Sequence, residues 1–176
     1  MCNSHRRFPP SLTYSHHLYL EHKNNWGIEG EVPDEDILLP IGKARIEREG
    51  ADISIVSWSA QLHVASEAAE NLQTKGISAE VIDLRSLWPW DKEAVFSSVE
   101  KTGRLLITHE SVSVGGFGAE IAATVSEHMF KALKHPVRRC AAPRVPISYA
   151  PPLEDMIRVT ANNIVDVATT MMDSGN

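Results

Sequence analysis

From Lys43 onward, short apolar runs alternate with amphipathic segments, and this rhythm leaves few architectures open to the chain. Runs that are β-branched or that alternate apolar and charged residues predict strands over residues 44–49, 52–58, 79–89, 104–110 and 137–142. Apolar residues at helical spacing predict helices over residues 59–75, 91–101, 118–133 and 153–171. Strands that alternate with helices indicate a mainly parallel sheet with helices on both faces. We therefore expect an α/β fold with five strands.

The first predicted strand, 44–49, differs from the others because charged residues alternate with apolar ones, as in an exposed or edge strand. Only a short link around Gly50 separates it from the next strand, whereas parallel neighbours need a crossover of about a dozen residues. We therefore expect these two strands to form an antiparallel pair at the edge of the sheet. Ser59 and Asp91 are expected to cap the helices that follow them, and Gly76 to end the first helix.

The N-terminal part reads differently from the rest. Residues 1–30 are expected to be a remnant of a preceding domain or disordered, with a short strand at "LYLEH" (18–22). Residues 31–43, rich in proline and acidic side chains, read as a linker. The α/β domain is expected to span residues 44–173.

Composition excludes several classes of protein. The net charge is −6 and lysines and arginines form no block, so binding to nucleic acid is not expected. No run reaches the roughly 20 apolar residues of a membrane span. The two cysteines, Cys2 and Cys140, lie far apart in the sequence and predict a reducing compartment rather than a disulfide framework. Cys140 itself reads as a small buried hydrophobe.

The stretch "HESVSVGGFGAEI" (109–121) raises the main functional question. It does not match the dinucleotide fingerprint, because Ile121 stands where the third glycine or alanine belongs and the loop follows a late strand. A phosphate loop of the Walker type also lacks its lysine. Two explanations of Gly115, Gly116 and Gly118 stay open: a tight strand-to-helix turn, or a helix start whose free N–H groups meet an anion or a partner.

His109 and Glu110 lie at the carboxyl end of a predicted core strand, the edge where open α/β sheets usually bind ligands. These two residues are the catalytic candidates, with His109 suited to proton transfer near neutral pH. The alternative is a histidine that is hydrogen-bonded at a domain or subunit interface.

Metal binding has little support. His16, His17, Glu21 and His22 cluster near the start, but adjacent residues on a strand point to opposite faces. The tryptophans at strand ends are expected at the edge of the core or at an interface rather than in a stacking platform; they are Trp58, Trp88 and Trp90.

Four segments, taken in order, resemble one family: "LYLEHK…GEVPDEDILLPIGKARIEREGADISIV", "AEVIDLRSLWPWD", "HESVSVGGFGAEIAA" and "APRVPISYAPPLED". The family is the beta subunit of the decarboxylating component of 2-oxo acid dehydrogenases, which act on pyruvate, branched-chain 2-oxo acids or acetoin. The resemblance covers roughly residues 18–172. It implies a transketolase C-terminal-type domain, a three-layer α/β/α sandwich with one antiparallel strand.

The resemblance also implies thiamine diphosphate, with magnesium, as the cofactor of the parent complex. The glutamate that activates this cofactor belongs to an N-terminal domain of which only "LYLEHK" has a counterpart here, so the cofactor is not expected to bind this chain alone. The implied partners are an alpha subunit, a second beta subunit and the binding domain of the acyltransferase core, in a homodimer or heterotetramer. The implied compartment is the bacterial cytoplasm or the mitochondrial matrix.

The resemblance supports an enzyme subunit that assists oxidative decarboxylation of a 2-oxo acid, pyruvate first, and acyl transfer to lipoyl groups. Two alternatives stay open. One is a stand-alone interaction module without chemistry, against which thiamine diphosphate binding in calorimetry would count. The other is a domain of a different thiamine enzyme, such as a transketolase.

Overall fold

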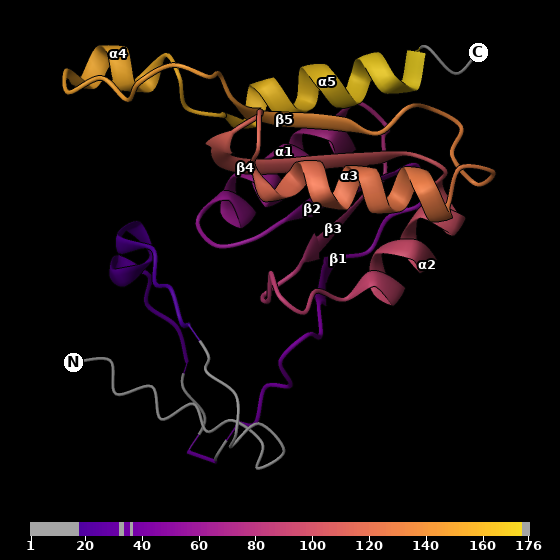
Figure 1. Ribbon diagram of the computed structural model, residues 1–176, viewed down its shortest axis with the longest axis horizontal. Helices are drawn as coiled ribbons and strands as arrows, with labels where there is room; N and C mark the ends of the chain where they lie inside the picture. Colours follow the sequence, from indigo (N-terminus) through magenta and orange to yellow (C-terminus); the bar gives the residue numbers. More distant parts are fainter. Residues whose placement is uncertain (1–17, 32–33, 36, 174–176) are drawn as a thin grey trace.

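The computed structural model describes residues 18–31, 34–35 and 37–173. The five strands form one sheet in the order β1-β3-β2-β4-β5, with α1 and α5 on one face and α2 and α3 on the other (Figure 1). This confirms the predicted three-layer α/β/α sandwich. In chain order the elements are the 3-10 helix η2 (Lys23–Gly27), β1 (Arg45–Arg48), β2 (Ile53–Ser57), α1 (Gln61–Thr74), β3 (Ala79–Asp83), α2 (Lys92–Thr102), β4 (Leu105–Val112), α3 (Phe117–His128), β5 (Arg138–Ala142), α4 (Pro151–Asp155) and α5 (Ala161–Asp173).

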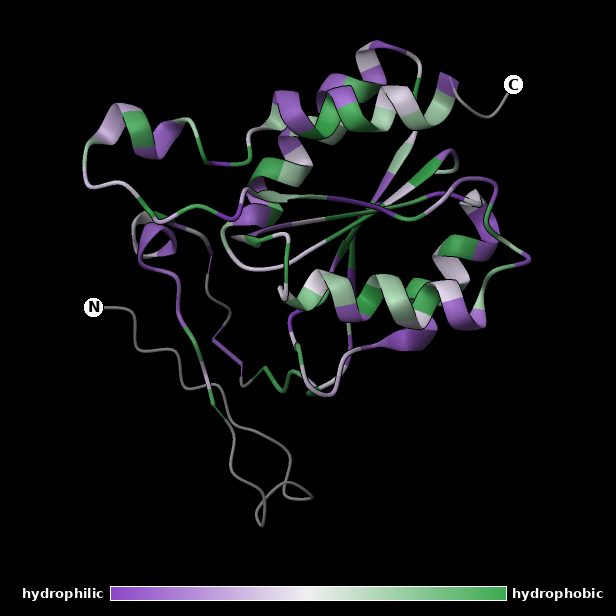
Figure 2. Cartoon of the chain, turned by 45° about the horizontal axis from the view of Figure 1, so that its top comes forward, coloured by the Kyte–Doolittle hydropathy of each residue, from purple (hydrophilic) through white to green (hydrophobic). Residues whose placement is uncertain are grey.

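The centre of the sheet is β2, which is parallel to β3 on one side and to β4 on the other. Every residue of β2 is buried, as its β-branched sequence predicts for a strand covered on both faces. Ile53 and Ile55 pack under α1 and α5, whereas Val56 packs under α2 and α3. Figure 2 shows apolar segments gathered in the strands and on the helix faces that turn toward them. Alternate side chains of this one strand therefore contribute to two hydrophobic cores, one on each face of the sheet.

The antiparallel edge strand is present, but its predicted partner was wrong. β1 pairs with β3, with Arg45 opposite Asp83 and Ile46 opposite Ile82, and not with β2. The chain leaves β1 through Gly50, where a Cβ atom would collide with the backbone of Ala79 and Glu80 at the start of β3. This close crossing lets the chain pass β3 before it enters the centre of the sheet.

Two of the three predicted helix signals are confirmed. Asp91 caps α2 by accepting a hydrogen bond from the backbone N–H of Ala94 at 3.2 Å. Gly76 follows α1 with a φ of +78°, a left-handed conformation that glycine adopts without strain. The prediction for Ser59 was wrong, because Ser59 has a φ of +58° and α1 begins after Ala60 without a side-chain cap.

Two predicted helices were too long. The stretch 153–171 divides into α4 and α5, because Thr160 and Asn163 form a reciprocal cap that starts a new helix. The Asn163 side chain accepts a hydrogen bond from the backbone N–H of Thr160 at 2.9 Å, and Thr160 Oγ1 accepts one from the N–H of Asn163 at 3.3 Å. Helix α3 ends at His128, and turns carry Met129 and Leu133 against the core.

The predicted strand over 18–22 is absent: these residues have no strand partner and lead into η2. A strand needs a neighbour to satisfy its backbone, which explains why the alternating pattern alone was insufficient. Residues 1–17, and the expectations placed on them, lie outside the described residues. Within the described ranges, no helix combines the length and the apolar character needed to cross a bilayer.

Candidate functional site

The sheet order places a reversal of winding at the ends of β2 and β4. The chain runs from β2 outward to β3 and then returns across β2 to β4, so the direction of winding reverses between these two strands. In open α/β sheets, ligands usually bind at such a reversal, outside the carboxyl ends of the strands. Trp58 directly follows β2, and His109 lies near the end of β4. The candidate site is therefore built around these two residues.

Aromatic rings are packed together at this reversal. The rings of His109 and Trp58 stack with centroids 5.3 Å apart and an interplanar angle of 16°, and Phe117 meets Trp58 edge-on at 6.0 Å. His109 is 1% exposed, and neither ring nitrogen has a hydrogen-bond partner among the described residues. The arrangement is that of a packed core rather than of an open ligand cavity.

Burial lowers the pKa of His109, so its ring is neutral at pH 7. The backbone of Ser111 lies near the ring without meeting the geometry of a hydrogen bond, and it raises the pKa only in part. The positive charge of Arg139 lowers it further. The ring is therefore neutral and enclosed in this chain, and a role of His109 in proton transfer stays a prediction.

The glycines of the loop after β4 fit against the His109 ring. A Cβ atom on Gly118 would lie 2.5 Å from His109 Nε2, and one on Gly116 would lie 2.7 Å from Cε1. Gly115 instead has open space around it and a φ of +77°. Close packing and a tight turn therefore account for all three glycines, and an anion or partner at this helix start stays a prediction.

Glu110 points to solvent and contacts the N-terminal segment. Its Oε2 atom lies 3.1 Å from Nε2 of His22, whose Nδ1 accepts a hydrogen bond from the backbone N–H of Asn24 at 3.2 Å. His22 therefore ties residues 22–24 to the edge of the sheet beside the candidate site. His16 and His17 lie outside the described residues, and the described ones contain no group of three histidine, cysteine, aspartate or glutamate side chains that could hold a metal ion.

Sequence reasoning missed a buried polar cluster under the same edge. Gln61 Nε2 donates hydrogen bonds to Thr108 Oγ1 at 3.2 Å and to the carbonyl of Val159 at 3.4 Å. Ser57 Oγ donates to the carbonyl of Thr108 at 3.1 Å. These contacts join α1, β2, β4 and the segment before α5. No local pattern predicts them, because 47 residues separate Gln61 from Thr108 and 98 separate it from Val159.

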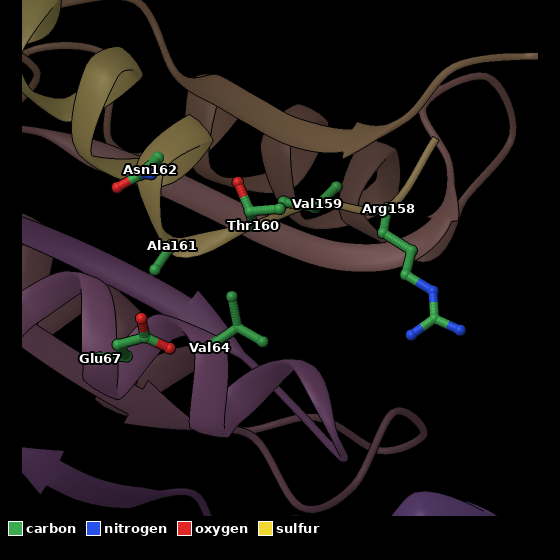
Figure 3. A pocket seen from close by; sticks show the side chains of 7 residues that line it. All are labelled: Val64, Glu67, Arg158, Val159, Thr160, Ala161 and Asn162. Carbon is green, nitrogen blue, oxygen red and sulfur yellow. The ribbon is translucent and has the colours of Figure 1, made fainter. Parts of the chain in front are cut away.

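A second hollow lies between α1 and the start of α5 (Figure 3), with a volume of about 290 Å³. Glu67 projects from α1, and Figure 3 shows the Arg158 guanidinium turned away from it. Arg158 is already paired with Glu154 at 2.7 Å and lies 3.6 Å from Asp155. The hollow therefore offers no free cation to an anionic ligand and no acid–base pair.

Cys140 and Trp90 pack in the core, whereas Trp88 does not. Cys140 is buried in β5, and burial raises the pKa of its thiol to about 11, which keeps it in the unreactive protonated form. Trp90 is buried, whereas Trp88 is 79% exposed. None of them forms a row of aromatic rings on which bases could stack.

The fold and the sequence place the chain in a known family. Residues 42–164 match the family described as "Transketolase, C-terminal domain", and the chain belongs to it. Among solved structures, one described as a split-gene transketolase in an inactive beta4 tetramer is 28% identical, with a TM-score of 0.69, and the match covers 84% of this chain and 47% of that one.

Several characterised relatives are beta subunits. The chain is 42% identical to the 2-oxoisovalerate dehydrogenase subunit beta of Bacillus subtilis over 84% of its own length and 46% of the relative's. It is 40% identical to the acetoin:2,6-dichlorophenolindophenol oxidoreductase subunit beta of Cupriavidus necator, over 90% and 47%. It is 41% identical to the mitochondrial pyruvate dehydrogenase E1 component subunit beta of Dictyostelium discoideum, over 86% and 44%. The chain thus spans less than half of each relative.

Proposed function

We propose that this chain acts as the C-terminal domain of a 2-oxo acid dehydrogenase beta subunit. The observation that supports this proposal is the similarity to three beta subunits of this kind, at 40 to 42% identity over 84 to 90% of the chain. In this role the domain supports oxidative decarboxylation of a 2-oxo acid and acyl transfer to lipoyl groups. Pyruvate is the first substrate to test.

The cofactor implied by this role, thiamine diphosphate with magnesium, does not fit the described residues. A diphosphate would need free backbone N–H groups and a magnesium ion would need clustered oxygen ligands. At the start of α3, the His109 ring occupies the space beside Gly116 and Gly118, and the described residues contain no cluster of metal ligands. We derive no catalytic step from this chain, and we assign the chemistry to the parent complex.

The contribution of this chain is assembly. Large apolar side chains are exposed in two segments that lie outside the layered core, residues 18–28 and residues 145–156. Exposed apolar groups of this size mark surfaces that other chains cover. We propose that an alpha subunit, a second beta subunit and the binding domain of the acyltransferase core cover them, in the cytoplasm of a bacterium or in the mitochondrial matrix.

Reconstitution tests this proposal. The chain would be fused to the N-terminal half of a related beta subunit and mixed with the matching alpha subunit, thiamine diphosphate and magnesium. We expect pyruvate-dependent reduction of a dye, and we expect none when the alpha subunit is left out. Pyruvate, 2-oxoisovalerate and acetoin would be compared side by side. Assembly without activity on any of the three would contradict the proposed function.

A second candidate role follows from the solved structure described as a split-gene transketolase, which shares 28% identity. Under that alternative, the reconstituted protein would transfer a ketol group between sugar phosphates. Measuring both reactions on the same preparation separates the two roles, since dye reduction needs an oxidisable 2-oxo acid and ketol transfer needs no oxidant.

A further inference from the structure

The outer edge of the sheet at β5 combines three features that no role described above uses. Strand β5 has β4 as its sheet partner on one side, and the described residues place no strand on the other. An unpaired edge offers a row of backbone N–H and C=O groups to an added strand. The chain therefore keeps a five-residue template for strand addition, Arg138–Ala142.

A groove of about 300 Å³ runs beside this edge. Its walls combine Arg139, Cys140 and Ala141 of β5 with the apolar Ile157 and Val167 and the polar Arg158 and Asn163, which come from the segment before α5 and from α5. Consecutive residues of a strand point to opposite faces of the sheet. A groove that is lined by three consecutive residues must therefore pass over the edge of the strand, where it offers apolar contact to the side chains of an added strand.

The basic residues around the β5 edge indicate the charge of the partner that this edge would bind. The chain has 23 acidic and 17 basic residues, yet residues 128–153 contain no acidic residue. The basic residues of this run are Lys131, Lys134, Arg138, Arg139 and Arg144. Arg138 and Arg144 are exposed, and neither forms an ion pair with any described residue. A basic edge on an acidic chain favours an acidic partner.

A second copy of β5 is a poor occupant. Two copies of β5 would bring four arginines and no carboxylate to the strand pair, so this pairing gains no charge complementarity. Nucleic acid would use the positive charge but not the unpaired backbone of β5 or the aliphatic side chains in the groove. We propose that the β5 edge binds an extended acidic peptide segment of a partner protein, which adds a strand to the sheet and places an aliphatic side chain in the groove.

The test uses the whole chain and a fluorescein-labelled peptide, Asp-Glu-Val-Glu-Val-Asp-Val-Glu-Asp, followed by anisotropy. We expect saturable binding that weakens as NaCl rises. Arg138→Glu/Arg144→Glu should weaken it at least tenfold and leaves the hydrogen bond from Arg139 to the Ser113 carbonyl in place. The control, Lys23→Glu/Lys75→Glu, changes the net charge equally away from β5 and should change affinity less than twofold. Amide NMR signals of residues 138–142 should shift on binding.

A second peptide, N-methylated at alternate amides, has the same charges and side chains but cannot complete strand pairing. It should bind at least tenfold more weakly. Equal binding of the two peptides, or equal competition by oligo-dT, would overturn the proposal in favour of a general polyanion surface. The absence of saturable binding, or equal loss in the control variant, would also overturn it. Reconstituted activity is measured separately, so either proposal can fail alone.

Discussion

At the scale of single residues, the His109 ring decides which side chains its neighbours can carry. The ring lies against Trp58 on one face and against Gly116 and Gly118 at its edge. A ring in this position excludes even one added methyl group nearby. It also prefers its neutral form, because protonation would bury a charge without a hydrogen-bond partner. Two predictions follow from these two constraints.

Gly118→Ala should lower the free energy of unfolding by about 1–3 kcal/mol, the usual cost of overpacking a core. The added Cβ atom would lie 2.5 Å from His109 Nε2 and 3.1 Å from Ile107 Cγ2. Urea unfolding measures the change. Gly30→Ala is the matched control, because a Cβ atom there meets nothing within 4 Å. When His109 is also changed to alanine, Gly118→Ala should lower the free energy of unfolding by less. Equal free energies of unfolding for Gly118→Ala and Gly30→Ala would contradict the packing argument.

The second prediction concerns pH. The pKa of His109 is lowered in the folded chain, so the unfolded chain takes up the proton more readily and stability falls as pH drops below the unfolded value of about 6.5. The slope from this residue is at most about 1.4 kcal/mol per pH unit. His109→Gln should flatten the fall between pH 6.5 and 5, measured by urea unfolding. His63→Gln, on the exposed face of α1, should leave the fall unchanged.

At the scale of elements, one ion pair fixes α2 on the sheet. Glu80 of β3 is 2% exposed and is paired with Lys101 of α2. Burial raises the pKa of Glu80, but the hydrogen bonds from Lys101 and Ser98 outweigh it and the net shift is downward. Beside this pair, the hydroxyl of Ser54 in β2 contacts those of Ser98 and Thr102. The helix is therefore held in register by polar contacts as well as by its apolar face.

Lys101→Ala should destabilise the chain by about 2 kcal/mol, because it leaves the buried Glu80 carboxylate without its cation. Glu49→Ala removes the other acid that contacts Lys101 Nζ, at 3.3 Å, and should cost less than about 0.5 kcal/mol since that side chain is 80% exposed. Thermal and urea unfolding both apply. A larger loss from the Glu49 change than from the Lys101 change would show that the buried pair is not the stabilising contact.

The elements also show how far sequence reasoning reaches. Local periodicity predicted four of the five strands to within two residues, because burial of one or both faces of a strand imposes a regular spacing of apolar side chains. It extended the strand predicted over 79–89 beyond the end of β3 at Asp83. It failed for the partner of β1 and for the stretch 18–22, where the outcome depends on which strands meet. It located His109 and Glu110 at the carboxyl edge but missed Gln61 and the stacking of Trp58, which depend on residues distant in sequence.

At the scale of the whole molecule, one segment of the layered domain, residues 145–156, exposes several large apolar side chains. We call this segment the arm. Helix α4 projects beyond the sheet (Figure 1), and the segment around it exposes Ile147 by 80% and Met156 by 79%. A free domain would gain by covering these side chains. The exposed side chains of the arm support the proposal that other subunits cover this part of the chain.

We expect the isolated chain to self-associate as its concentration rises, with sedimentation velocity as the measurement. Ile147→Ser/Tyr149→Ser should shift the distribution toward the monomer, because both side chains are at least 80% exposed and contribute little to folding. Phe130→Ser removes an apolar side chain that is 77% exposed after α3 and serves as the control. A chain that stays monomeric at all concentrations would argue against the arm as an association surface.

The stack of Trp58 on His109 has a practical consequence for chemists who seek inhibitors. In many sheets wound this way, the gap where the winding reverses accepts a small molecule. Here a drug-sized compound would first have to displace the His109 ring, which packs against Gly116 and Gly118, and the Trp58 ring stacked on it. Screening campaigns against this domain should therefore aim at the exposed segments 18–28 and 145–156, where a compound would block the association proposed above.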